Sequence, residues 1–180
     1  MLTYAGVCTR IEIVGSDFIN VAQRISSGGA RLHFRRRRSD LAIRMGHLAI
    51  TVGDMEKSLD FYTKGFGFKQ SFELARPETG EPWIVYLYMG NGQFVELFYG
   101  GKNPYKWDVA DRAYNHVCFA VDDIREAAAR LEAAGYPLDK QPKVGCDGNW
   151  QCWITDPDGV RIEIMQLAAG SPQMNAMTDQ

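Results

Sequence analysis

Apolar and polar residues alternate in two stretches of the chain that resemble each other, GHLAITVGD at 46–54 and NHVCFAVDD at 115–123. Alternation with a period of two is typical of a β-strand with one buried face. Each stretch has a histidine in second place and ends in an aspartate. Asp54 and Asp123 stand just before runs with helical spacing, where an aspartate can cap a helix. The pattern therefore predicts a strand followed by a helix at both places.

The segment after Asp54 continues the first pattern. Apolar residues recur at helical spacing over 55–66, and nearby glycines end the predicted helix. Three more strands are predicted at 68–75, 83–89 and 93–99, and the sequence Gly-Asn-Gly joins the last two as a hairpin. The predicted order of the first module is β-α-β-β-β.

The segment after Asp123 repeats this order. It is predicted to contain a helix at 124–135, a short strand at 136–141 and a loop rich in Gly, Pro and Asp, and then strands at 149–155 and 160–166 joined by Asp-Pro-Asp-Gly. Self-similarity at this scale indicates a duplication, so we predict an α+β fold of two tandem βαβββ modules. The predicted boundaries are an N-terminal extension at 1–44, a domain at 45–168 with modules at 45–101 and 113–168, and a C-terminal tail at 169–180.

Superposing the two copies aligns His47 with His116 and Glu96 with Glu163. By strand alternation each histidine shares its face with small residues, while large apolar residues occupy the opposite face. A carboxylate in the middle of a strand is costly to bury without a partner, and a metal ion would remove that cost. Two His and two Glu suit a borderline divalent ion such as Ni²⁺, Co²⁺, Zn²⁺, Mn²⁺ or Fe²⁺. We therefore predict one shared metal site, and we expect Cys118 and Cys152 to be small buried residues rather than ligands.

Charge and composition narrow the class of protein. The formal net charge is −2, which gives no overall indication of nucleic-acid binding. The four cysteines form no C-x-x-C pair. We find no secretory signal and no apolar run of about 20 residues. We therefore expect a cytoplasmic protein that binds neither nucleic acid nor membrane.

The first 44 residues differ in charge from the rest of the chain. They hold eight Arg and three acidic residues, a balance of +5, against −7 for residues 45–180. The run Arg35–Arg38 is compatible with a patch for nucleic acid or an acidic partner, or with a targeting extension. We favour a disordered tail, or upstream sequence before a true start at Met45.

Residues 45–168 resemble the vicinal oxygen chelate superfamily, which includes glyoxalase I, extradiol dioxygenases, fosfomycin-resistance enzymes and methylmalonyl-CoA epimerase. The resemblance rests on GHLAITVGDMEKSLDFYTKGFGF, FVELF, YNHVCFAVDDIREAAARLEAAG and DPDGVRIEI. It implies two modules whose sheets curl as an incomplete barrel around one metal cleft. In many members that cleft forms between the subunits of a dimer, so a homodimer is expected.

The His/Glu/His/Glu set is most similar to that of bacterial glyoxalase I, the lactoylglutathione lyases. The resemblance implies His47, Glu96, His116 and Glu163 as ligands of one divalent ion per site, with Ni²⁺ or Co²⁺ favoured and Zn²⁺ possible. It also implies that the chain isomerises the hemithioacetal of methylglyoxal and glutathione, and so detoxifies methylglyoxal. Glu163 would take the carbon proton and return it to the neighbouring carbon, and Glu96 would exchange a proton on the opposite side.

The glutathione pocket departs from the family pattern. Thr51 stands where glyoxalase I usually has an Arg, and Gly100 stands where an Asn is common. Lys143 matches a lysine that grips glutathione, although the loop length differs. The candidate substrate-binding residues are Thr51, Phe98, Lys143, Trp150 and Arg161. Four aromatic residues either shape an apolar pocket or belong to the core, namely Phe94, Phe98, Trp150 and Trp153. We favour the core for them. The expected substrate is a small molecule, and we favour a thiol adduct.

Several other functions remain open. An epimerase or isomerase acting on another substrate such as an acyl-CoA would use the same metal-held enolate chemistry. Fe²⁺ extradiol dioxygenases and Mn²⁺ thiol transferases use three protein ligands, so a fourth ligand argues against both. A drug-binding resistance protein without catalysis would lack the ligands. Metal content separates these classes.

Overall fold

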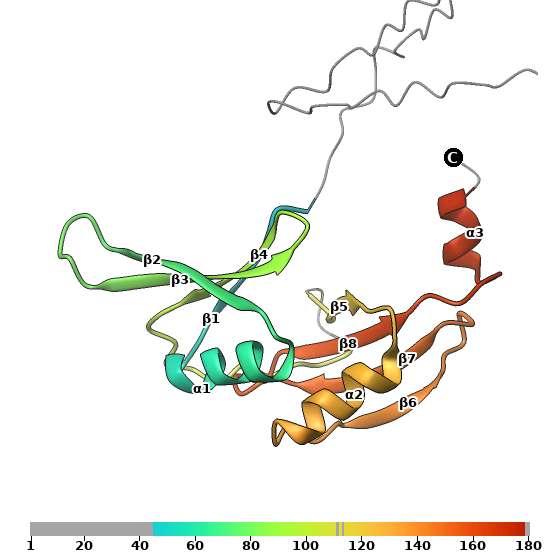
Figure 1. The fold of residues 1–180 in the computed structure, drawn as a ribbon. Helices are drawn as coiled ribbons and strands as arrows, with labels where there is room; N and C mark the ends of the chain where they lie inside the picture. The colour runs from blue at the N-terminus through green and yellow to red at the C-terminus, as the bar shows by residue number, and fades with distance from the viewer. Residues whose placement is uncertain (1–44, 111, 113, 179–180) are drawn as a thin grey trace, which may run out of the picture. The chain divides into compact units, whose positions relative to one another are not determined.

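The structure, a computed structural model, describes residues 45–110, 112 and 114–178, and these form the two modules in tandem (Figure 1). The predicted N-terminal extension lies outside the described residues. The elements of the first module are β1 His47–Thr51, α1 Met55–Asp60, η1 Phe61–Gly65, β2 Lys69–Ala75, β3 Pro82–Gly90 and β4 Gln93–Phe98. Those that follow are β5 Val117–Ala120, α2 Ile124–Ala133, β6 Lys140–Val144, β7 Trp150–Thr155, β8 Arg161–Gln166 and α3 Pro172–Thr178.

The strands form two four-stranded sheets. Sheet A has the order β1-β4-β3-β2, and sheet B has the matching order β5-β8-β7-β6. In each sheet the first and last strands of the module pair in parallel, and the other neighbours are antiparallel. The predicted α+β class and the duplication are confirmed. Within the described residues the two sheets are separate and neither closes into a barrel.

Both predicted helix caps are present. The side chain of Asp54 accepts a hydrogen bond from the backbone N–H of Lys57, and that of Asp123 accepts from the N–H groups of Arg125 and Glu126. An aspartate at this position satisfies N–H groups that the first turn leaves unpaired. The first helix continues from α1 into η1, a π-helical segment, so the run predicted at 55–66 changes pitch rather than ending at residue 60.

One face of each sheet packs against the helices and the other face is open. In β1 the odd positions His47, Ala49 and Thr51 are exposed while Ile50 is buried, and β5 alternates in the same way. The buried faces contribute to the hydrophobic core, which also includes Phe61, Tyr62 and Leu131 from the helices. The alternation therefore turns the predicted histidine side of each sheet away from the core.

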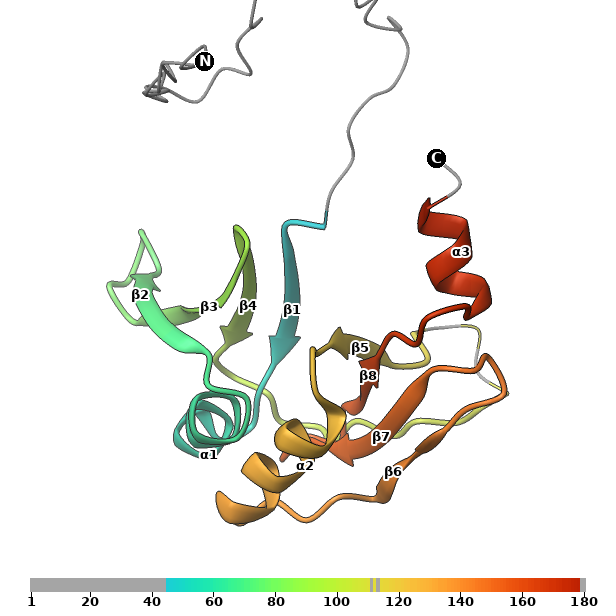
Figure 2. The same ribbon diagram turned by 45° about the vertical axis from the view of Figure 1, so that its right-hand side comes forward.

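The two modules are joined through their helices. The hydroxyl of Tyr62 in η1 donates to Asp156 in the turn before β8, at 2.8 Å. The rings of Phe61 and Tyr136 make an edge contact at 4.9 Å. In both views α1 and α2 lie side by side (Figures 1 and 2). The Asp-Pro-Asp-Gly turn of module two is thus part of the contact with module one.

The structure corrects three expectations for module two. The strand predicted at 136–141 lies later, at Lys140–Val144, because the Gly145 N–H bonds to the Asn149 carbonyl and closes a hairpin on β7. This is an edge strand, which tolerates Pro142. Lys143 consequently belongs to β6 rather than to a loop. Cys152 is buried as expected, whereas Cys118 is exposed on the open face. The predicted C-terminal tail contains the short helix α3.

Candidate active site

The parallel pairing of β1 with β4 brings the first predicted pair of ligands together. Ala49 is the register partner of Glu96, so His47, two residues earlier, lies on the same open face as that glutamate. The Nδ1 atom of His47 is 3.2 Å from Oε1 of Glu96. The Glu96 side chain is only 9% exposed, whereas that of His47 is 55% exposed. A nearly buried carboxylate is therefore held against an accessible imidazole.

The corresponding pair in sheet B is equally close but presents a different ring nitrogen to the carboxylate. Nε2 of His116 is 3.0 Å from Oε2 of Glu163. The other ring nitrogen, Nδ1, is 2.9 Å from the amide oxygen of Asn115. An amide oxygen only accepts, so the imidazole proton belongs at Nδ1. Nε2 then directs a lone pair toward the carboxylate.

A cation placed between such a ring nitrogen and a carboxylate oxygen would stabilise both groups. Two donors each about 2.1 Å from one metal ion and at right angles to each other are about 3.0 Å apart, close to the separation in both pairs. The donor chemistry, imidazole nitrogen and carboxylate oxygen, also suits Ni²⁺, Co²⁺ or Zn²⁺. Each pair therefore fits as half of a coordination shell.

The structure does not bring the four predicted ligands together. Within the described part of the chain, no group of three or more His, Cys, Asp or Glu side chains is placed to hold one ion. The quartet is divided into a pair on sheet A and a pair on sheet B. We call these pairs the two half-sites.

A different side chain adjoins the glutamate in each half-site. Tyr86 is the register partner of Glu96, and burial, followed by the charge of Glu96 and a hydrogen bond to it, raises the pKa of the tyrosine. Cys118 is the register partner of Glu163, and desolvation, followed by the charge of Glu163, raises the pKa of the thiol to about 12. The thiol is therefore protonated at neutral pH. No sequence motif marked Tyr86, although the register of the hairpin places it beside Glu96.

The predicted substrate-binding residues fall in different places. Phe98 shares the open face with Glu96, and Arg161 shares it with Glu163. Lys143 is the register partner of Gln151, two residues from Trp153, and so lies at the edge of the same face. Trp150 does not reach this face, because it packs against the core next to Arg125 of α2. Trp150 and Trp153 are three residues apart on β7, so their side chains lie on opposite faces of the sheet.

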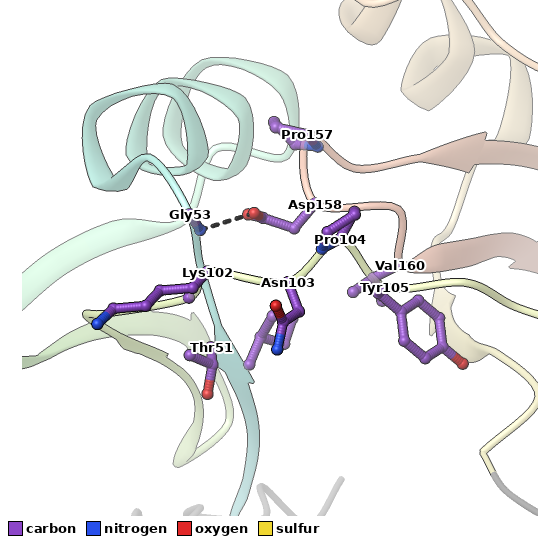
Figure 3. Close-up of a pocket in the computed structure, with 11 residues that line it drawn as sticks. Thr51, Gly53, Lys102, Asn103, Pro104, Tyr105, Pro157, Asp158 and Val160 are labelled. Atoms are coloured by element: carbon purple, nitrogen blue, oxygen red, sulfur yellow. Dashed lines mark hydrogen bonds between the residues drawn. The ribbon is translucent and has the colours of Figure 1, made fainter.

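Thr51 lines a cavity of about 500 Å³ at the end of β1, and none of the four predicted ligands is among the residues that line it (Figure 3). The segment Gly101–Tyr105 and the turn before β8 form the rest of its wall. Asp158 also lines the cavity, and its Oδ1 accepts a hydrogen bond from the Gly53 N–H at 2.7 Å. The side chains of Lys102 and Asn103 also border the cavity, and no sequence motif marked them.

The family of the chain follows from comparison with known sequences. Residues 44–164 match the model of the Glyoxalase/Bleomycin resistance protein/Dioxygenase superfamily. The chain belongs to this superfamily. Because the match covers both modules, the resemblance first noted in the histidine and glutamate motifs is confirmed.

Named relatives within the superfamily are glyoxalase I enzymes. The probable lactoylglutathione lyase of Vibrio cholerae is 32% identical over 133 residues, which cover 68% of this chain and 90% of that protein. The lactoylglutathione lyase of Neisseria meningitidis serogroup A is 29% identical over 142 residues, covering 76% and 99%. Among solved structures, the trypanothione-dependent glyoxalase I of Leishmania major is 30% identical with a TM-score of 0.57, over 77% of this chain and 94% of that one.

The comparisons support a glyoxalase-type protein of this superfamily, whose members also include proteins that are not enzymes. The glyoxalase I relatives imply a divalent metal in general. In the described part of the chain, no helix has the length and apolarity needed to span a membrane.

Proposed function

We propose that the protein is a metal-dependent lyase of the glyoxalase I type, which isomerises the hemithioacetal of a 2-oxoaldehyde and a thiol. One observation carries the proposal. Each module directs a histidine nitrogen at a glutamate oxygen, 3.0–3.2 Å away, on the open face of its sheet. The relatives named lactoylglutathione lyase support the reaction.

The residues divide the chemistry between them. A divalent ion held by His47, Glu96, His116 and Glu163 would supply Lewis-acid polarisation of the substrate's oxygens. Glu163 would take the proton from the carbon that carries sulfur and deliver it to the neighbouring carbon, which conserves atoms and charge over the cycle. Glu96 would exchange a proton on the opposite side of the substrate.

The surrounding side chains orient these groups. Asn115 accepts from Nδ1 of His116, and this contact fixes the ring so that Nε2 faces Glu163. In module one Tyr86 instead donates a hydrogen bond to Glu96 and so orients the carboxylate. The low exposure of both glutamate side chains limits the water that competes with the substrate.

We propose further that the two half-sites meet across a homodimer, each ion taking His47 and Glu96 from one chain and His116 and Glu163 from the other. The open faces of both sheets and the division of the quartet support this assembly. Two ligands alone are too few for the four- to six-fold coordination that these ions adopt. Ni²⁺ or Co²⁺ is the proposed ion, with Zn²⁺ as the alternative, and the proposed location is the cytoplasm.

Turnover of the methylglyoxal–glutathione hemithioacetal tests the reaction. The purified protein is stripped with a chelator and reloaded with Ni²⁺, Co²⁺ or Zn²⁺ in turn, and thioester formation is followed by absorbance. We expect activity only after reloading, and we expect Glu163→Gln to lower kcat at least about a hundredfold, because the variant lacks the base. Glu132→Gln on α2 makes the same chemical change far from the open face and should keep full activity.

Three results would contradict the proposal. A protein that binds nickel, cobalt or zinc without turning over this substrate would indicate another proton transfer, such as epimerisation of an acyl-CoA. A protein that retains only iron and consumes oxygen with a catechol would indicate a dioxygenase. Absence of any bound metal would indicate a non-catalytic binder.

A further inference from the structure

Arg161 is held between two tryptophan rings on the open face of sheet B. Its guanidinium carbon is 3.8 Å from the ring centroid of Trp107 and 5.0 Å from that of Trp153. Trp153 comes from the adjacent strand β7, whereas Trp107 comes from the segment that links the modules. Cation–π contacts with both rings restrain the guanidinium and leave its N–H groups able to donate.

The charge of Arg161 is not used inside the described part of the chain. No carboxylate there lies within ion-pair distance of its guanidinium, and no oxygen there accepts a hydrogen bond from it. The carboxylate of Asp139 accepts a hydrogen bond from Thr155, the register partner of Arg161, and forms no ion pair with the guanidinium. An arginine that is held rigidly without an anionic partner is ready to receive one.

The neighbourhood of this stack is cationic. Lys140 is the register partner of Trp153, and its ammonium lies 5.5 Å from that ring. Lys143 lies further along the same edge strand. The acidic side chain at the centre of the face, Glu163, already faces His116. An anion at Arg161 would therefore meet a favourable field.

An unused donor lies in the same stack. The indole Nε1 of Trp107 is buried and has no hydrogen-bond partner among the described residues. Leaving a buried donor without a partner costs about 1–3 kcal/mol. An acceptor on a ligand would remove that cost, so the indole and the guanidinium both indicate an oxygen-bearing ligand.

The position of the stack connects it to the proposed chemistry. Arg161 precedes Glu163 by two residues on β8, so the two side chains share a face about 6.6 Å apart along the strand. A ligand gripped by Arg161 can therefore extend to the half-site without leaving the sheet. His116 also touches this group, since its ring is 4.9 Å from the Trp153 ring.

We propose that Arg161 is a specificity-determining residue that binds an anionic group of the substrate, with Trp107 and Trp153 holding it in place. The inference rests on the proposed function for the reacting end of that substrate. The ligand chemistry is a carboxylate or phosphate remote from the reacting carbon, supplied either by a peptide thiol such as glutathione or by an acyl-CoA. Either anion accepts two parallel hydrogen bonds from a guanidinium.

Titration calorimetry on the full-length, metal-loaded protein tests this inference without turnover. The probes are S-methylglutathione, its diethyl ester and coenzyme A. We expect the wild type to bind one of the two anionic probes, and Arg161→Leu to weaken that binding by about tenfold or more. Arg161→Lys keeps the positive charge but lacks the two parallel N–H groups of the guanidinium, so its affinity should be intermediate. If S-methylglutathione binds and its diethyl ester does not, the anionic group is a carboxylate. If coenzyme A binds more tightly than S-methylglutathione, the anionic group is a phosphate.

Arg76→Gln is the matched control, because Arg76 lies over Trp83 in module one in a similar cation–π contact, away from sheet B. Circular dichroism and thermal unfolding establish that each variant is folded. Equal affinity of Arg161→Leu and Arg76→Gln would overturn the inference, and so would a wild type that binds neither anionic probe. Turnover with an unchanged KM in Arg161→Leu would reject the inference but keep the proposed reaction. Anion binding that depends on Arg161, in a protein that does not turn over the hemithioacetal, would keep the inference and reject the proposed reaction.

Discussion

Asp156 is a buried carboxylate whose hydrogen bonds join the two modules. Its Oδ2 accepts from the Tyr62 hydroxyl, and its Oδ1 accepts from the N–H groups of Asp158 and Val160. Burial is the largest influence on this group and raises its pKa above the ordinary value of 3.8 despite those bonds. A residue in a turn thus serves both the local conformation and the packing of the modules.

The raised pKa predicts how Asp156 affects stability with pH. A raised folded-state pKa means that folding favours the protonated carboxyl, so its stabilisation is complete below about 3.8 and is lost as the pH rises through the higher folded-state value. Asp156→Asn keeps the shape and Oδ1 without titrating. We therefore expect the free energy of unfolding of the wild type to fall relative to that of Asp156→Asn as the pH rises above about 3.8, the ordinary pKa of an aspartate.

Chemical denaturation at a series of pH values measures this difference. Asp156→Ala is the contrasting variant, because it leaves the Tyr62 hydroxyl buried without a partner and should cost about 1–3 kcal/mol at every pH. A difference between the wild type and Asp156→Asn that stays constant with pH would show that the carboxyl does not titrate abnormally.

At the scale of elements, the end of β1 is fixed by the segment that follows β4. The N–H of Gly101 donates to the Val52 carbonyl at 3.0 Å. A Cβ atom at Gly101 would lie 2.8 Å from the carbonyl carbon and oxygen of Val52, and backbone cannot move aside as a flexible side chain can. This close approach sets where the first strand ends and where the cavity beside Thr51 begins.

Gly101→Ala should therefore destabilise the protein. We expect a loss of about 1–3 kcal/mol in the free energy of unfolding, since the extra methyl group must push two backbone segments apart. Gly46→Ala is the control, because a Cβ atom there meets nothing within 4 Å. Thermal and urea unfolding compare the two variants, and equal stability would show that the segment after β4 can shift without cost.

The elements also show what the sequence could and could not predict. The faces of β1 and β5 were predictable because alternation assigns them, and the pairing of His47 with Glu96 follows from joining the first and last strands of one module. The position of β6 was not predictable from its residues, because the hairpin closed by Gly145 and Asn149 sets it. Trp150 packs against the core, the role favoured for the aromatic candidates, because its side of the sheet is set by where β7 begins.

At the scale of the whole molecule, local sequence patterns could not show whether the four predicted ligands come together. Matched positions predicted one shared ion, but whether the half-sites meet depends on how the modules and any second copy assemble. No periodicity within a strand encodes that arrangement. The Trp107–Arg161–Trp153 stack was equally hidden, because Trp107 lies 54 residues before Arg161, in a segment without a regular pattern.

The proposed dimer makes a prediction that a single chain cannot mimic. His47→Ala and His116→Ala should each be inactive alone, because each removes one ligand from both sites of the dimer. When the two variants are co-expressed, half of the randomly paired dimers are mixed, and each mixed dimer regains one of its two sites. We therefore expect about a quarter of the wild-type activity per protein.

Differently tagged copies of the two variants allow the mixed dimer to be isolated and assayed for hemithioacetal turnover. The control is co-expression of His47→Ala with Glu96→Gln, which damages the same module in both chains and should restore nothing. Inactivity of the isolated mixed dimer would place each site within one chain.

The two open faces, though built from repeated modules, differ in chemistry. Beside Glu96 lie the rings of Phe72 and Tyr86, stacked at 4.2 Å, whereas beside Glu163 lies the cationic stack around Arg161. Two identical half-sites would otherwise hold a substrate in either of two opposite orientations with nearly equal energy. In the site proposed here, one wall is aromatic and the other is basic, so a substrate with one anionic end has a single preferred pose. The proton then returns to one side of the carbon, and the duplicated frame yields a product of a single handedness.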